Sequence, residues 1–236
     1  MSVIRRLFGQ YPPGYGSRRI RVFLRREDLK VGKEACQRVQ AEHGLQVPKN
    51  RQRRRIAGFR PRPLAPAQAN SVWSYYFVCD ACTNGQQLKC LTFIDEYKLE
   101  ALAIDVAGSI RSAREIDVMA RVISMRGAPR YLRSDNGLEF VSTALLSWVV
   151  EQGIEMALID PGQPWQNGTN ESFNGKFRDE CLSAEWFRNR LEVKVVIEDW
   201  WLHYNQVRPR SSLGDETSET FSKKISTNLL AGAIPT

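Results

Sequence analysis

Strand patterns and helix patterns follow one another in a set order from residue 72 onward, and this order limits the fold more than any other feature. Val72–Cys79 is rich in aromatic and β-branched residues, which is typical of a strand. Asn84-Gly85 is a strong hairpin signal, and the strand pattern continues behind it at Leu88–Asp95 and Ala101–Val106. The sequence therefore predicts a sheet that begins as an antiparallel meander.

Helical patterns then alternate with further strands. The expected elements are a helix at Ala113–Met125, a strand at Tyr131–Ser134, a helix at Thr143–Gln152, a strand at Ile154–Leu158, and helices at Asn170–Leu182 and Arg190–Val207. Alternation of this kind after an antiparallel opening implies a mixed sheet with helices on its faces. We therefore expect an α/β fold with a mixed five-stranded sheet flanked by helices.

Positive charge is concentrated in the N-terminal part of the chain. Residues 1–62 contain 17 Lys/Arg and 4 Asp/Glu, a net charge of +13, whereas the remaining 174 residues carry 17 and 22, a net charge of −5. A basic head on a mildly acidic body is typical of a nucleic-acid-binding segment joined to a catalytic or scaffolding domain. The alternative is a basic terminus that serves only solubility.

The basic head is expected to contain two short helices, one carrying Ile20, Phe23 and Leu24 on one face and one at Lys33–Glu42. They resemble part of a helix-turn-helix module, with a non-specific basic arm as the alternative. We expect a DNA-binding segment at residues 1–48, a basic and proline-rich linker at 49–69, a core at 70–225 and a C-terminal tail at 226–236. The arginines expected to contact DNA phosphates are Arg18, Arg19, Arg25, Arg26, Arg51, Arg53, Arg54 and Arg55.

Compartment and redox state follow from what the sequence lacks. No apolar segment of signal-peptide length opens the chain and no membrane span is expected, so we predict a cytoplasmic protein. The cysteines show no disulfide-framework spacing. Cys79, Cys82 and Cys90 have no fourth zinc ligand nearby in the sequence, so we interpret them as structural thiols.

Two carboxylates lie in stretches suited to chemistry. Asp135 follows a short apolar strand and precedes Asn136-Gly137, a turn that would leave its carboxylate at the sheet edge. Glu171 lies at the start of a helix behind a loop with proline and glycine. Two oxygen ligands that meet there would suit Mg²⁺ or Mn²⁺. From the residues alone, a turn-forming aspartate and a glutamate favoured by the helix dipole are an equal alternative.

The helix that begins near Glu171 also carries Lys176 and Arg178. Both would project near the two carboxylates, which makes them candidate phosphate contacts. Solvated charges on a helix surface are an equally good interpretation.

Motifs along most of the chain resemble the integrase-like transposases of the insertion sequence three family. They are Trp73-Ser74-Tyr75, Leu91–Tyr97, Arg133–Phe140, Asn167–Gly175 and Tyr204–Pro209. The basic head is similar to the second helix-turn-helix region of that family. The resemblance implies a retroviral-integrase-like core with the RNase H-like fold. It also implies an Asp, Asp, Glu triad that binds two Mg²⁺ or Mn²⁺ ions for DNA cleavage and strand transfer.

On the matching positions, Asp135 and Glu171 are the second and third members of that triad, as catalytic and metal-binding residues. The first member is expected three residues after Trp73, where this chain has Tyr76. A phenol with a pKa near 10 is a poor Mg²⁺ ligand, so we predict metal binding that is weakened or absent and an enzyme that is strongly impaired or inactive.

Two other carboxylates, Asp80 and Asp95, lie close enough in the sequence to be considered as replacements for the expected one. Asp80 lies four residues beyond Tyr76, about 13 Å along an extended strand, which is too far. If Asn84-Gly85 centres a two-residue hairpin, Ser74 faces Asp95 and Tyr76 faces Phe93. Asp95 would then be a diagonal neighbour of Tyr76 at about 7–8 Å and a weak candidate for partial replacement.

The resemblance also implies partners and roles. The expected partner is double-stranded DNA, both as the terminal inverted repeats of an insertion sequence and as target DNA. Further copies of the chain are expected to form a homo-oligomer on that DNA, and a protein from an upstream reading frame is a possible additional partner. The leading hypothesis is a transposase-family protein with a damaged metal site. The alternative is a catalytically inactive DNA-binding remnant or a competitor of active transposase. Arg210 and Ser218 also depart from the family, which usually has histidine and proline there.

Overall fold

The computed structural model describes residues 2–11, 15–46, 64–135, 142–160, 164–184 and 186–232. The chain divides into two compact units, residues 1–60 and 61–236. The first unit contains α1 (Ser2–Gln10), α2 (Ser17–Arg26) and α3 (Lys33–Glu42). α2 and α3 lie where the sequence predicted helices, whereas α1 was not predicted. Ile4, Leu7 and Phe8 of α1 are buried, at the spacing that one helix face requires.

The second unit is built on a five-stranded mixed sheet with the strand order β3-β2-β1-β4-β5. β1 (Val72–Ala81), β2 (Gln87–Asp95) and β3 (Glu100–Ala107) are antiparallel neighbours. β4 (Tyr131–Ser134) pairs with β1 and with β5 (Glu155–Leu158) in parallel. The predicted sheet and its element order are confirmed.

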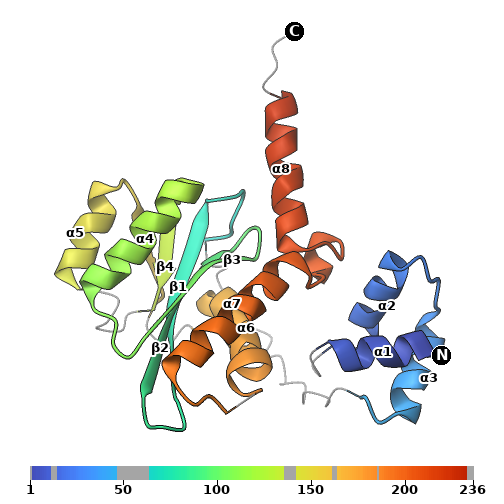
Figure 1. Cartoon of the computed structure of the whole chain (residues 1–236). Coiled ribbons are helices and arrows are strands. Elements are labelled where there is room, and N and C mark those ends of the chain that lie inside the picture. The colour runs from blue at the N-terminus through green and yellow to red at the C-terminus, as the bar shows by residue number, and fades with distance from the viewer. Residues whose placement is uncertain are drawn as a thin grey trace. The chain divides into compact units, whose positions relative to one another are not determined.

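Helices cover both faces of the sheet (Figure 1). α4 (Ser112–Arg126) and α5 (Thr143–Glu151) lie on one face, and α6 (Gly168–Phe177) and α7 (Arg190–Gln206) lie on the other. A layer of buried apolar side chains separates the sheet from each helix pair. The side chains of β1 alternate between these layers, so Trp73, Tyr75 and Phe77 face α4 and α5.

The turn between β1 and β2 differs from the predicted two-residue hairpin. The Cys82 amide donates to the Gln86 carbonyl (2.9 Å), and the Gly85 amide donates to the Cys82 carbonyl (2.9 Å). Gly85 has a φ of +81°, the left-handed conformation that glycine adopts without strain. The loop therefore contains three residues, Thr83, Asn84 and Gly85, and its glycine occupies the left-handed position usual for such loops.

This longer loop shifts the register of the hairpin by one residue. Tyr76 lies opposite Thr92, and Asp95 lies opposite Trp73, which corrects the pairing expected from the sequence. Because side chains alternate along a strand, a shift of one residue moves Asp95 to the other face of the sheet from Tyr76.

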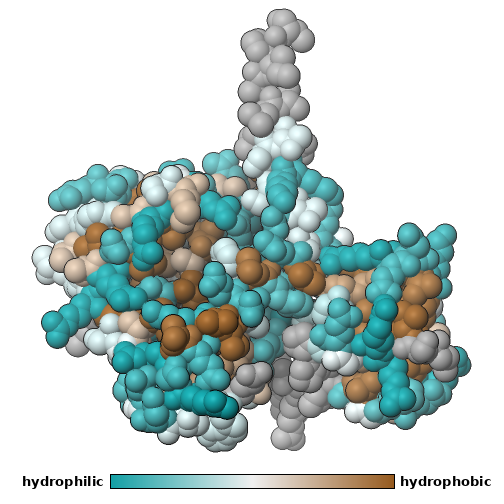
Figure 2. Space-filling view, in the orientation of Figure 1, coloured by the Kyte–Doolittle hydropathy of each residue, from teal (hydrophilic) through white to brown (hydrophobic). Residues whose placement is uncertain are grey.

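The remaining elements complete the second unit. α6 is preceded by a 3₁₀ turn, η1 (Pro164–Asn167), and followed by a π-helical segment, η2 (Arg178–Leu182). A second 3₁₀ turn, η3 (Ser211–Leu213), leads to α8 (Ser218–Gly232), which crosses residue 225, where the core was expected to end. In the described parts of the chain, no helix is both long and apolar enough to cross a membrane. Figure 2 shows mostly hydrophilic side chains on one face, with hydrophobic ones exposed between them.

Candidate active site

Tyr76, Asp135 and Glu171 line one open pocket of about 410 Å³ on the α6 side of the sheet. Tyr76 projects from the middle of β1, Asp135 follows the last residue of β4, and Glu171 lies in the first turn of α6. Arg178 also lines this pocket. The structure therefore brings together four of the residues singled out in the sequence, from three separate stretches of the chain.

Asn170 fixes the start of α6 over β1. The Ser74 hydroxyl donates to Oδ1 of Asn170 (3.0 Å), and Nδ2 of Asn170 donates to the Tyr75 carbonyl (3.5 Å). Ser74 and Asn170 are both fully buried. Because a buried amide that is satisfied on both sides holds one orientation, this contact sets the position of the neighbouring Glu171.

The phenol of Tyr76 stays protonated in this pocket. Burial is the largest cause that raises its pKa above 10, and the negative charges of Asp135 and Glu171 raise it further, while Arg178 opposes them. A neutral phenol supplies no anionic oxygen at neutral pH. It is therefore not equivalent to a carboxylate as a ligand for a hard cation.

The side chains in this pocket do not fit a pair of divalent ions. Such pairs usually need three carboxylates, and this pocket offers two, Asp135 and Glu171, with a phenol, a guanidinium and two neutral amides beside them. Within the described ranges, no group of three or more His, Cys, Asp and Glu side chains is placed to hold a metal ion.

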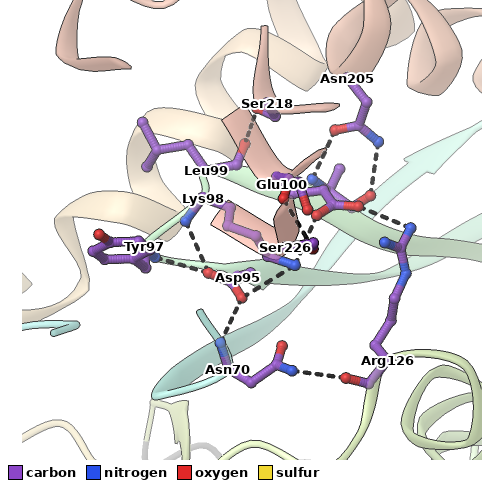
Figure 3. Close-up of polar contacts among 12 residues, drawn as sticks. Asn70, Asp95, Tyr97, Lys98, Leu99, Glu100, Arg126, Asn205, Ser218 and Ser226 are labelled. Atoms are coloured by element: carbon purple, nitrogen blue, oxygen red, sulfur yellow. Dashed lines mark hydrogen bonds and ion pairs between the residues drawn. The ribbon is translucent and has the colours of Figure 1, made fainter. Parts of the chain in front are cut away.

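Asp95 cannot serve as a third carboxylate in this pocket. It is fully buried on the opposite face, where its carboxylate accepts hydrogen bonds from the backbone amides of Asn70, Tyr97 and Lys98 (each 2.9 Å). The Lys98 ammonium pairs with it at 3.6 Å and with Glu100 at 2.9 Å. Figure 3 shows this polar cluster, in which Asp95 shapes the turn from β2 to β3.

Asn167 and Asn174 also line the pocket, and neither was predicted to be a site residue. Both lie within the Asn167–Gly175 motif. Asn174 is three residues beyond Glu171, so the two side chains share one face of α6. This spacing was the available signal, but it predicts neighbours on a helix and does not predict a pocket.

The charged residues predicted on α6 differ in their surroundings. Lys176 donates from Nζ to the Ser172 carbonyl on its own helix (2.9 Å) and does not line the pocket. Arg178 is exposed at the pocket, so the two expected phosphate contacts are not equivalent.

The N-terminal unit has a basic pocket of its own, of about 430 Å³. Arg21, Arg25 and Lys30 line it together with Val31 and Gly32. Arg25 was predicted as a DNA contact, whereas Arg21 and Lys30 were not. For Lys30 the reason is that only the turn between α2 and α3 brings it near α2.

The other predicted DNA contacts of this unit are more dispersed. Arg18 and Arg26 are exposed, and the guanidinium of Arg26 lies 5.1 Å from the Phe23 ring centre. Arg19 is half-buried, with its guanidinium 4.9 Å from the Tyr15 ring centre. The remaining predicted arginines, Arg51, Arg53, Arg54 and Arg55, lie outside the described residues.

Comparison with known proteins matches the second unit to one family description. Two models described as integrase core domain match residues 66–164 and 152–217. The matched range contains every strand of the sheet together with Tyr76, Asp135 and Glu171.

Curated relatives from insertion elements extend the likeness into the first unit. A 39.2 kDa protein of insertion element IS476 from Xanthomonas euvesicatoria is 41% identical over 94% of this chain and 64% of its own length. A 31.7 kDa protein of insertion element IS407 from Burkholderia multivorans is 38% identical over 89% of this chain and 76% of its own length. The chain thus spans slightly less than two thirds of the first of these relatives.

The fold is also that of a solved integrase core. The catalytic core domain of HTLV-2 integrase, solved in complex with magnesium in a dimeric form, aligns with a TM-score of 0.50 at 16% identity, over 66% of this chain and 99% of that one. At this identity the likeness concerns the fold alone, and it confirms the predicted RNase H-like architecture.

Proposed function

Because this chain belongs to the integrase-core transposases of the insertion sequence three family, we propose that it binds the ends of an insertion sequence and that Tyr76 disables its metal site. The observation that carries the proposal is the position of Tyr76 in one pocket with Asp135 and Glu171. DNA cleavage and strand transfer, the activity of the family, would then be strongly impaired or lost.

The expected loss of activity is large. A bound metal ion contributes several kcal/mol to the stabilisation of a phosphoryl-transfer transition state, and each ~1.4 kcal/mol corresponds to about tenfold in rate. Loss of one ion from a pair would therefore slow cleavage by roughly a thousandfold or more. Asp135 and Glu171 remain as ligands for at most a weakly held Mg²⁺ or Mn²⁺.

Double-stranded DNA, as terminal inverted repeats and as target, is the proposed macromolecular partner. Arg21, Arg25 and Lys30 form a pocket of positive charge within the N-terminal unit, which suits a backbone phosphate. Arg18, Arg19 and Arg26 and the basic run Arg51–Arg55 would add sequence-independent contacts. In this proposal the DNA-binding segment is residues 1–48 and the catalytic core is residues 70–225. Residues 49–69 link these two parts, and residues 226–236 form a C-terminal tail. At the core, Arg178 would meet a phosphate, with Lys176 in a lesser role.

We further propose that the protein self-associates on DNA. A protein from an upstream reading frame is proposed as an additional partner, and the cytoplasm is the proposed location. Leu191 and Val195 of α7 support a contact between copies, since these apolar side chains are 74% and 57% exposed. They lie four residues apart and so occupy one face of the helix.

A second candidate function is that of a silent competitor, which occupies insertion-sequence ends and blocks active transposase. The packing around the pocket favours it. Phe173 and Phe177 of α6 are almost fully buried against the sheet, which supports a folded pocket that does not depend on a bound metal. A competitor needs this folded surface and DNA binding, and it does not need cleavage.

Metal binding tests the proposal without relying on activity. The melting temperature of the full chain should not rise as Mg²⁺ or Mn²⁺ is added, whereas Tyr76→Asp should be stabilised by the metal through its affinity for the folded state. Tyr76→Phe is the matched control and should behave like the unmodified chain. Equal metal-dependent stabilisation of the unmodified chain and Tyr76→Asp would contradict the proposal.

A further inference from the structure

The pocket at Tyr76 contains two buried acceptors that the described residues leave without a partner. Asn167 and Asn174 are each 8% exposed, and Oδ1 of neither accepts a hydrogen bond within the described parts of the chain. Both residues line the pocket. A buried carbonyl oxygen without a donor costs free energy, so acceptors retained at a pocket point to a ligand that donates hydrogen bonds.

Asn170, on the same stretch of chain, shows that these acceptors differ from an ordinary structural amide. Its Oδ1 accepts from the Ser74 hydroxyl, and its Nδ2 donates to the Tyr75 carbonyl. Asn170 therefore holds α6 in place. Asn167 and Asn174 lie before and after it in the sequence and present their oxygens without such partners.

The carboxylates of Asp135 and Glu171 also line this pocket, and three of the other lining residues suit a flat, partly apolar ligand. Tyr76 supplies a half-buried aromatic ring, Ile159 a buried aliphatic side chain, and Arg178 a guanidinium. The volume of about 410 Å³ lies in the range of small-ligand sites. An aromatic ring with a few placed polar groups is the chemistry by which proteins hold nucleic-acid bases outside a duplex.

We propose that this pocket binds an unpaired nucleobase at a DNA end, with the base stacked on Tyr76 and its amino group donating to Asn167 or Asn174. The inference rests on the proposed binding of DNA and specifies the part of the DNA that this site takes. A base within an intact duplex cannot reach such a pocket because it must first leave the stack. Frayed or overhanging DNA ends provide an unpaired base at a small cost in free energy.

Tyr76 thereby has opposite effects on two kinds of binding in this pocket, that of metal ions and that of a base. It removes a carboxylate that a metal pair requires, and it adds the aromatic surface that a base requires. Binding of the unpaired end is then independent of divalent metal, in contrast with binding through a metal bridge to phosphate. The Tyr76 hydroxyl is not needed for stacking, so phenylalanine should replace tyrosine.

The test compares a blunt duplex with the same duplex carrying an unpaired 3′ adenine, both bound by the full chain in the presence of EDTA. We expect tighter binding of the overhang. Tyr76→Ala should reduce that preference by about fivefold to a hundredfold, the range for loss of one stacked base. Tyr76→Phe should keep the preference, and Tyr76→Asp should lose it. Asn174→Ala should reduce it by about twofold to tenfold, the loss of one hydrogen bond.

Fluorescence of 2-aminopurine placed at the unpaired position gives a direct readout, because stacking on an aromatic ring quenches it. Quenching should occur with the unmodified chain and Tyr76→Phe but not with Tyr76→Ala. Tyr131→Ala, at a half-buried tyrosine outside the pocket, is the matched control and should leave quenching intact. Circular dichroism establishes that each variant is folded.

The outcomes separate this inference from the proposed function. Tight binding of both duplexes without preference for the unpaired end would overturn the inference and leave DNA binding intact. A preference that appears only with Mg²⁺ would assign the pocket to a cation and also overturn it. Failure to bind either duplex would refute the proposed DNA binding and the inference together.

Discussion

Nε of Arg210 donates a 2.8 Å hydrogen bond to the hydroxyl of Ser218, and both side chains are buried. Ser218 in turn donates to the Leu99 carbonyl (3.0 Å), and the Arg210 guanidinium lies 3.9 Å from the Tyr204 ring centre. The pair therefore ties the start of α8 to the β2–β3 turn and to α7. From the family resemblance, histidine and proline are expected at these two positions. In this chain Arg210 and Ser218 fit each other, because Ser218 supplies the hydroxyl that accepts from Arg210, and a proline at that position would supply none.

Ser218→Ala should destabilise the second unit by about 1–3 kcal/mol, because the buried guanidinium loses an acceptor and keeps its charge. Urea denaturation followed by circular dichroism measures the change. Ser218→Thr is the control, since it keeps the hydroxyl. Equal stability of Ser218→Ala and the unmodified chain would show that the contact contributes nothing to folding.

Asp95→Ala should cost about 3 kcal/mol or more, because the backbone amides of Asn70, Tyr97 and Lys98 lose a charged acceptor. Asp105→Ala is the comparison. Asp105 pairs with Arg114, whose side chain is 43% exposed, so that change should cost about 1 kcal/mol or less. Similar losses of unfolding free energy for the two variants would contradict the structural role assigned to Asp95.

Alanine at Arg21, Arg25 and Lys30 together should flatten the salt dependence of DNA binding. Each lost phosphate contact reduces the slope of log K against log salt by about 0.9, so the triple variant should lose roughly 2–3 units of slope. Arg5→Ala with Arg38→Ala removes two cations of the same unit that lie outside the pocket. If both sets of substitutions change the slope equally per charge, the pocket has no special role.

Acidification should destabilise the second unit through His203. Burial, followed by the charge of Arg208, lowers the pKa of His203 below its ordinary 6.5, while Glu180 opposes the shift. The unfolded chain therefore binds this proton first, and the stability present above pH ~6.5 is lost as the pH falls toward the lower folded-state pKa. Melting temperatures at about pH 7.5 and 5.5 should differ less for His203→Gln than for the unmodified chain. An unchanged difference would exclude His203 as the cause.

Most of the second unit could be predicted because its strands and helices have local signals. Trp73 to Val78 alternate between two buried layers, and Asn189 caps α7 by accepting from the Leu191 and Glu192 amides. The hairpin register could not be predicted from Asn84-Gly85, because the same dipeptide fits two-residue and three-residue loops. That one residue decides on which face of the sheet Asp95 lies.

The candidate site was predicted in part. Asp135, Glu171 and Tyr76 could be placed by motif, and the structure brings them together in one pocket. The roles of Asn167 and Asn174 could not be predicted, since whether a buried amide is satisfied depends on contacts from distant segments. The pocket of the N-terminal unit was missed for a similar reason, because Lys30 approaches α2 only through a turn.

Cleavage at an insertion-sequence terminal inverted repeat in Mg²⁺ shows whether Tyr76 disables the metal site. The full chain, Tyr76→Asp, and Tyr76→Asp combined with Glu171→Gln are compared under single-turnover conditions. Tyr76→Asp should cleave about a thousandfold faster than the unmodified chain or more, and the double variant should fall back to the unmodified rate. If the unmodified chain cleaves as fast as Tyr76→Asp, Tyr76 does not disable the metal site.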